Sequence, residues 1–150
     1  MMNRRTFLRG LTLGIISAPL VADAQQTGLR SSVWSAGPRE LGAGVSFLVI
    51  EGNPSKAGPF VLHARFPPGH TVGPHTHPNA EHITVLSGTV LIGWGQVWDP
   101  AKFKAVPAGE DLLLPAGKAH FAAFPEQTVM EVRAVGPWEV EYILDADDPR

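Results

Sequence analysis

The sequence reads Gly69-His-Thr-Val-Gly-Pro-His75-Thr-His77-Pro-Asn-Ala-Glu81 near its middle, and a further histidine, His120, follows later. The two histidines of the His-x-His pair project to the same side if this segment is extended. The short turn-forming stretch before Glu81 can bring its carboxylate round to the same point. Imidazoles and a carboxylate in this pattern suit a divalent first-row metal ion with open positions. A packed histidine or a chance His-x-His pair is the alternative, and the spacing favours a metal site.

This spacing resembles the first motif of the cupin superfamily. That motif runs glycine, five residues, His-x-His, three or four residues, glutamate, six residues and glycine. In this sequence the five positions are occupied by Gly69, His75, His77, Glu81 and Gly88. Every position of the motif is therefore matched.

The second cupin motif is matched except at its last position. It runs glycine, five residues, Pro-x-Gly, two residues, histidine, three residues and asparagine. Gly109, Pro115, Gly117 and His120 fit, but Phe124 stands where the family has asparagine. Because that asparagine is not a metal ligand in the family, the change affects the polarity of the pocket more than the metal. The two motifs are specific when they occur together.

The resemblance covers roughly residues 45–143 and implies a fold and a ligand set. The implied fold class is all-β, a single antiparallel β-barrel of the cupin type, jelly-roll-like, with the metal inside. The implied ligands are His75, His77, Glu81 and His120. They would hold one divalent ion, for which iron, manganese, zinc, nickel and copper all remain open.

The distribution of apolar residues supports this fold independently. Short apolar runs alternate with turn signals rich in Gly, Pro, Asn and Asp, which is typical of a sandwich or barrel. These runs are residues 45–50, 60–66, 83–86, 90–94, 112–114, 129–135 and 140–144. With 14 Pro and 16 Gly there is little room for an amphipathic helix. We expect an N-terminal arm with a first strand (25–44), the barrel (45–144) and a polar tail (145–150) that frays.

The N-terminus has the pattern of an export signal, predicted over residues 1–24. Arg4 and Arg5 precede an apolar run at residues 11–22, and Ala22-Asp-Ala24 resembles a signal-peptidase site. Paired arginines followed by Phe-Leu resemble the twin-arginine signal. The alternatives are a transmembrane anchor, a disordered basic tail or the general secretory route. We expect a periplasmic or secreted protein that meets the membrane only through this signal.

Composition limits the partners and the number of domains. The 150 residues carry a net charge of -2, and removing the predicted signal leaves 9 basic and 13 acidic residues, a charge of -4. Nucleic acid is therefore an unfavourable partner. The chain has no cysteine, so it needs no disulfide in either redox compartment. After cleavage one domain is expected, and the resemblance to small cupins, together with exposed sheet edges, predicts a homodimer.

Strand alternation predicts which side chains line a pocket. Ile83 and Val85 continue the face of Glu81, whereas Ala122 and Phe124 share the face of His120. These four neighbours are apolar, so we expect a dry pocket. Farther along, we expect the set Met130, Val132 and Ala134 to face the interior, and Trp94, Trp98 and Trp138 to wall the barrel mouth, with core or interface positions as the alternative.

Four polar residues are expected to lie away from the metal. His63 and Arg65 alternate with apolar residues and should face outward or into an interface. His82 is out of phase with Glu81 and should point away. His70, next to a glycine, is expected to be a solvated turn residue.

Two classes of function follow from this reading. The first is a metal-dependent oxidoreductase of the dioxygenase type, acting on a small oxygen-bearing organic substrate, with Glu81 as ligand and proton acceptor. The second is a non-catalytic cupin module that binds or senses a small ligand. An isomerase or decarboxylase is a further alternative, although those reactions want a placed general acid that the sequence does not supply. Fold alone does not separate these classes.

Overall fold

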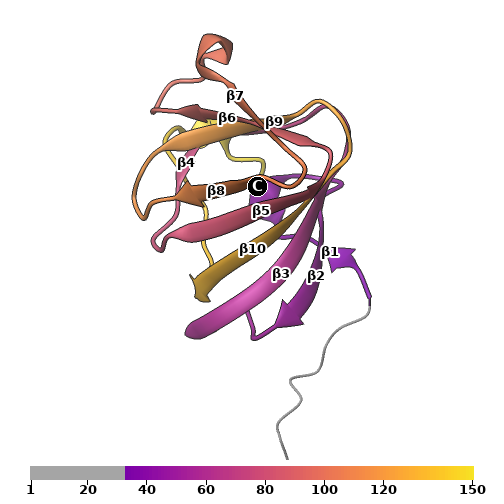
Figure 1. Cartoon of the computed structure of the whole chain (residues 1–150). Helices are drawn as coiled ribbons and strands as arrows, with labels where there is room; N and C mark the ends of the chain where they lie inside the picture. Colours follow the sequence, from indigo (N-terminus) through magenta and orange to yellow (C-terminus); the bar gives the residue numbers. More distant parts are fainter. Residues whose placement is uncertain (1–32) are drawn as a thin grey trace, which may run out of the picture.

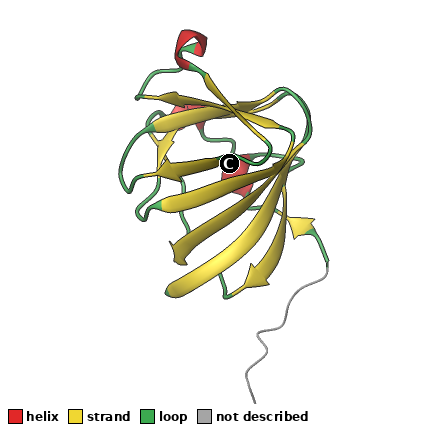
Figure 2. Cartoon of the chain, in the orientation of Figure 1, coloured by secondary structure: helices red, strands yellow, loops and turns green. Residues whose placement is uncertain are grey.

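The structure is a computed structural model that describes residues 33–150; the predicted export signal and the first part of the N-terminal arm lie outside the described residues. The elements of this part, in order, are β1 (Ser35–Ala36), η1 (Arg39–Leu41), β2 (Ser46–Glu51), β3 (Gly58–Phe66), β4 (His70–Thr76), β5 (Glu81–Ser87), β6 (Thr89–Trp94), η2 (Pro100–Lys102), β7 (Lys104–Pro107), β8 (Asp111–Leu114), β9 (His120–Phe124), β10 (Thr128–Gly136), β11 (Glu141–Tyr142) and η3 (Asp145–Asp147). The three η elements are single 3-10 turns, and strands dominate the picture (Figure 2). None of the helical turns among these residues is long and apolar enough to cross a membrane.

The strands form two antiparallel sheets that face each other (Figure 1). The six-stranded sheet has the order β1-β2-β3-β10-β5-β8, and the five-stranded sheet has the order β11-β4-β9-β6-β7. After β3 the chain crosses repeatedly from one sheet to the other, with only β6 and β7 consecutive in the same sheet, and the core lies between the two layers. The predicted all-β fold with a cupin-type antiparallel barrel is confirmed.

Alternation along β3 shows why these residues form a two-faced strand. Phe60, Leu62, Ala64 and Phe66 are all buried, whereas the residues between them are half-buried. The same holds on β10, where Met130 and Val132 are buried opposite Ala64 and Leu62. A strand with this period buries one face against the second sheet. The prediction that His63 and Arg65 leave the interior is confirmed, because they lie on the other face, where His63 Nε2 is 3.1 Å from a carboxylate oxygen of Glu131.

Strand pairing brings the two sequence motifs together. β4 and β9 are neighbours in the five-stranded sheet, and their register places His75 directly opposite His120. Glu81 is the first residue of β5 in the six-stranded sheet, where it is paired with Leu114 and Ala134. The histidines and the carboxylate therefore approach each other from opposite layers.

The outer face of the five-stranded sheet carries a second apolar layer, which the sequence did not predict. Phe121 has 0% exposure, although it lies on the opposite face of β9 from His120. Its ring contacts those of Trp98 and Phe103, at centroid distances of 5.3 and 5.4 Å. A Cβ at Gly93 would fall 2.1 Å from the Phe121 ring, so this close contact requires glycine there. Trp98 is thus not at the barrel mouth as predicted, because it covers Phe121 outside the barrel.

The expectation for His70 is wrong. His70 is not a solvated turn residue, because it begins β4 and its Nε2 donates a hydrogen bond of 2.7 Å to the carbonyl of Leu41. At the end of the polar tail, Arg150 forms ion pairs with Asp148 at 2.5 Å and with Glu40 at 3.3 Å. Both side chains hold the turn η1 against the body of the domain.

Candidate metal centre

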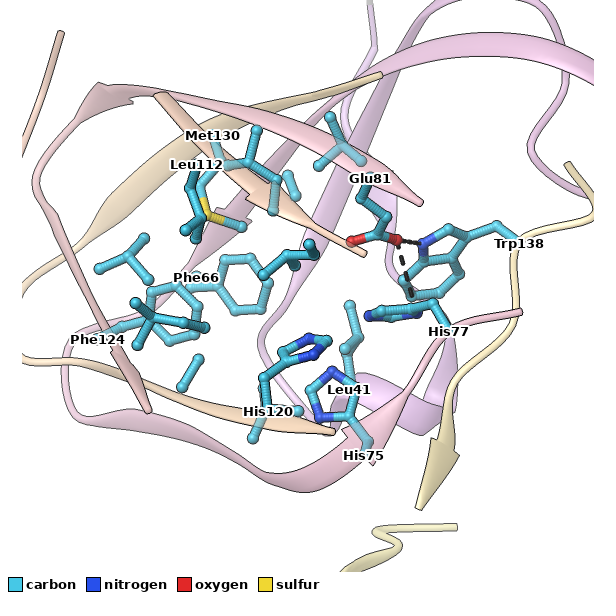
Figure 3. Close-up of a pocket in the computed structure, with 18 of the residues that line it drawn as sticks. Leu41, Phe66, His75, His77, Glu81, Leu112, His120, Phe124, Met130 and Trp138 are labelled. Atoms are coloured by element: carbon cyan, nitrogen blue, oxygen red, sulfur yellow. Dashed lines mark hydrogen bonds and ion pairs between the residues drawn. The ribbon is translucent and has the colours of Figure 1, made fainter. Parts of the chain in front are cut away.

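Three histidines meet between the sheets at one end of the core (Figure 3). His75 lies near the end of β4, His77 follows that strand, and His120 begins β9. One ring nitrogen of each lies within 4.8 Å of the others. All three side chains are buried, with exposures of 2–5%. The His-x-His pair and the later histidine thus form one group, as their spacing indicated.

Each of these rings is oriented by a backbone carbonyl that accepts from its Nδ1. The hydrogen bonds are His75 to Gly73 at 2.7 Å, His77 to Glu139 at 2.7 Å and His120 to Lys118 at 3.0 Å. A carbonyl oxygen can only accept, so each Nδ1 carries the proton and each Nε2 keeps a free lone pair. Such bonds fix the tautomer and the ring direction that metal-binding histidines need.

Burial keeps these imidazoles neutral. It lowers the pKa of His75 well below 6.5, and the neighbouring His120 and His77 lower it further. It also lowers the pKa of His77, and it lowers the pKa of His120 to about 4. Metal binding requires the neutral ring, so at neutral pH no proton has to leave before an ion binds.

Glu81 faces the histidines from the other sheet but is bonded elsewhere. The indole Nε1 of Trp138 donates a hydrogen bond to Glu81 Oε1, and that oxygen lies 3.5 Å from His77 Nδ1. The second carboxylate oxygen points away from Trp138 into the cavity (Figure 3). Burial raises the pKa of Glu81 to about 7, although the indole N–H partly opposes this. The group of possible ligands within 4.8 Å contains the three histidines without Glu81.

A cavity of about 60 Å³ extends from this group into the core. Apart from the three histidines and Glu81, its walls are apolar side chains from both sheets. At the end away from the histidines, the rings of Phe66 and Phe124 stack with centroids 3.9 Å apart and planes within 3°. Phe124, at the position where cupins have asparagine, therefore contributes an apolar wall.

The predicted pocket residues divide in two groups. Ile83, Ala122 and Phe124 line the cavity. Val85 does not line it, although its exposure is 1%, because it lies two residues farther along β5 opposite Met130, where it packs in the core. Ala134, expected inside with Met130 and Val132, is only half-buried.

The structure also places the remaining tryptophans and His82, whose positions the sequence predicts. Trp138 lines the cavity, as expected for a wall residue. Trp94 is half-buried beside His120, with its ring under Lys118 Nζ at 4.1 Å. His82 is exposed on the outer face of β5, which confirms that it points away from the histidines.

Sequence reasoning missed the indole bond to Glu81 and the presence of Leu41 in the cavity wall. Glu81 and Trp138 are 57 residues apart, and nothing in the local pattern connects them. A tryptophan that directly follows Pro137 near the end of the domain was the only available signal, and it was too general to identify the partner.

The donor set fits a metal ion. Three neutral imidazoles, each with its second nitrogen bonded to a carbonyl, offer nitrogen ligands of the kind that zinc, copper, iron and nickel accept. Glu81 lines the same cavity as the histidines, although it lies outside their group. The residues present therefore suit the divalent ion that the motifs implied.

Comparison with known proteins agrees with the fold. The model of a family described as the ChrR cupin-like domain matches residues 27–139. A search among curated proteins found no match. Among solved structures, the polyketide cyclase RemF from Streptomyces resistomycificus is similar, with 20% identity, a TM-score of 0.62 and coverage of 75% of this chain and 80% of that chain. At this identity the likeness concerns the fold alone.

Two further solved structures show the same architecture. A cupin-2 domain protein from Rhodospirillum rubrum has 14% identity and a TM-score of 0.58, covering 77% of this chain and 76% of that chain. A conserved protein with a double-stranded β-helix domain from Klebsiella pneumoniae has 18% identity and a TM-score of 0.55, covering 78% of this chain and 95% of that chain. All three solved structures share the layered β-fold of this chain.

Proposed function

Since this chain belongs to the family of ChrR cupin-like domains, we propose that it is a metal-dependent oxidoreductase of the dioxygenase type acting on a small oxygen-bearing organic substrate. The observation that carries this proposal is the three-histidine group, His75, His77 and His120, with each Nδ1 bonded to a carbonyl and each lone pair free. Three protein nitrogens leave positions of a five- or six-coordinate ion open. Such a site resembles a catalytic centre more than a closed structural one.

The side chains of the protein position the substrate, exclude water and provide a proton acceptor. When bound, a divalent ion of a redox-active metal supplies Lewis acidity and electron transfer for oxygen chemistry. The apolar walls exclude water from the reacting groups, which strengthens electrostatic interactions there. Glu81, with its pKa raised to about 7, takes a proton from an enol or phenol at neutral pH.

The size and lining of the cavity restrict the substrate. A volume of about 60 Å³ admits only a small molecule unless side chains move. The stacked rings of Phe66 and Phe124 suit a flat or short apolar portion, and the histidine end suits its oxygens. Enols and 1,3-diketones have this combination of properties.

Oxygen uptake tests the proposal. The purified chain, loaded separately with iron, manganese, copper and nickel, is offered enols, flavonols and diketones in an oxygen electrode. We expect one metal form to consume oxygen and, with ¹⁸O₂, to place both atoms in the products. Glu81→Gln should reduce turnover more than substrate binding, since the amide cannot accept the proton.

His82→Ala is the matched control, because His82 is exposed on the outer face and should leave uptake unchanged. If all metal forms fail to consume oxygen and yet bind a candidate ligand tightly, the enzyme proposal is wrong. The chain is then a small-ligand binding or sensing module.

A further inference from the structure

The segment between β1 and β2 covers the histidine group from outside the sheets. Its turn η1 ends at Leu41, whose side chain is buried with 6% exposure and lines the cavity. Figure 3 shows Leu41 beside His75 and His77. A leucine from this turn thus completes a wall that is built mostly from strand residues.

On the other side of this wall lies an outer groove of about 830 Å³. Phe47 and Trp138 line both the groove and the inner cavity, and their rings meet edge to face with centroids 5.7 Å apart. Pro38 and Glu40 line the groove, whereas Leu41 lines the cavity. The partition between the two spaces therefore consists of Leu41, Phe47 and Trp138.

Leu41 is the member of this partition with the least support from the sheets. Phe47 lies in β2, which is paired with β1 and β3. Trp138 is bonded at both its indole and its backbone N–H, which donate to Glu81 and to the carbonyl of Pro54. Leu41 instead lies on a single 3-10 turn, followed by Gly42 at φ 85° and, two residues later, Gly44 at φ 87°.

Side chains from three distant elements hold the turn in place. His70 Nε2 donates to the Leu41 carbonyl at 2.7 Å, and the Tyr142 hydroxyl donates to the Glu40 carbonyl at 2.5 Å. Arg150 forms an ion pair with the Glu40 carboxylate at 3.3 Å. Among residues 33–150 no strand ladder includes the turn, so breaking these side-chain contacts leaves the hydrogen bonds of both sheets in place.

We propose that the turn Arg39–Leu41 is a removable cover, and that small neutral or cationic molecules reach the histidines from the outer groove when Leu41 swings out. The groove is lined by five carboxylates, Glu40, Glu139, Glu141, Asp145 and Asp148, and by one guanidinium, Arg150. Because Arg150 is paired with two of these carboxylates, the groove remains negative and repels anions. The assignment of these molecules as substrates rests on the proposed function; the route itself does not.

Alkylation of the buried histidines in metal-free protein tests this proposal independently of turnover. Bromoacetamide and bromoacetate have similar size and differ in charge, and the chain has no cysteine to compete for them. Mass spectrometry of peptides gives the rate at His75, His77 and His120 relative to exposed His82, which serves as an internal standard. We expect Leu41→Ala to raise the relative bromoacetamide rate at the three histidines by tenfold or more.

Two further variants keep the test decisive. Met130→Ala enlarges the same cavity at the end away from His75 (Figure 3), so it should leave the rates within about twofold of the wild type. Tyr142→Phe removes one tether and keeps the ring, so it should raise the rates by a smaller factor than Leu41→Ala. Melting curves of all variants show whether the fold is retained.

The comparison of bromoacetate with bromoacetamide tests whether the groove repels anions. In Leu41→Ala, bromoacetate should modify the three histidines at least threefold less than bromoacetamide, after each is normalised to His82. Equal normalised rates for the two reagents would contradict the proposal that the groove repels anions. If neither Leu41→Ala nor Tyr142→Phe speeds modification, or if Met130→Ala speeds it equally, the turn is not the cover.

Discussion

Glu81→Gln should make the metal-free protein more stable at alkaline pH, and the gain should vanish in acid. Burial raises the pKa of this carboxyl from 4.5 to about 7 in the folded chain. The folded state therefore binds more protons than the unfolded state between these two values. The wild type loses stability as the pH rises through about 7, whereas the amide does not titrate.

The magnitude follows from the size of the shift. A shift of one pKa unit corresponds to about 1.4 kcal/mol, so the change from 4.5 to about 7 corresponds to about 3 kcal/mol at pH 9. Glu81 is buried, with 4% exposure, so solvent screening reduces this only slightly. For a domain of this size the difference is roughly 6–12 °C in Tm.

Urea unfolding of chelator-treated protein at pH 5, 7 and 9 measures the effect. The difference in unfolding free energy between Glu81→Gln and the wild type should grow by about 2.5 kcal/mol from pH 5 to pH 9, because a small part of the loss has already occurred at pH 5. Glu110→Gln, which changes an exposed carboxyl, is the matched control and should follow the wild type. Parallel pH profiles for Glu81→Gln and the wild type would refute the argument that this carboxyl is buried at an ionisation cost.

Three further predictions concern the indole, the surface and the N-terminus. Trp138→Phe keeps an aromatic side chain but removes the indole N–H bonded to Glu81, so metal affinity measured by chelator competition should fall about tenfold to a hundredfold, whereas Trp98→Phe on the outer face should leave it unchanged. Light scattering at micromolar concentration should give twice the chain mass, because the end strands of the two described sheets leave edges that a second copy can cover; a monomeric mass would refute this prediction. Changing Arg4 and Arg5 together to Lys should block export, and continued export would indicate the general secretory route.

Much of the fold and of the candidate site could be predicted from local sequence patterns. Fixed spacing around His75, His77 and His120 was enough to group them, because the resemblance places both motifs on neighbouring strands. Alternation in residues 60–66 predicted which side chains of that strand face the core, because successive side chains of a strand point to opposite faces. These features depend on neighbours in the sequence and on a fold that the motifs identify.

Features made by distant partners could not be predicted in the same way. The bond from Trp138 to Glu81 and the insertion of Leu41 depend on where a loop ends in three dimensions, which no periodicity records. Phe121 was equally hidden, because its strand has apolar residues on both faces and a second layer covers the outer one. His70 was misjudged because its acceptor, the Leu41 carbonyl, lies 29 residues earlier.

Metal stoichiometry tests the central claim most directly. Elemental analysis of the purified chain, after incubation with a divalent ion and removal of the excess, should give one ion per chain. His75→Ala combined with His77→Ala should abolish this, whereas His82→Ala should retain it, since that ring is on the outer face of the six-stranded sheet. Stoichiometric metal in the double variant, or none in the wild type, would contradict the assignment of a metal centre to these histidines.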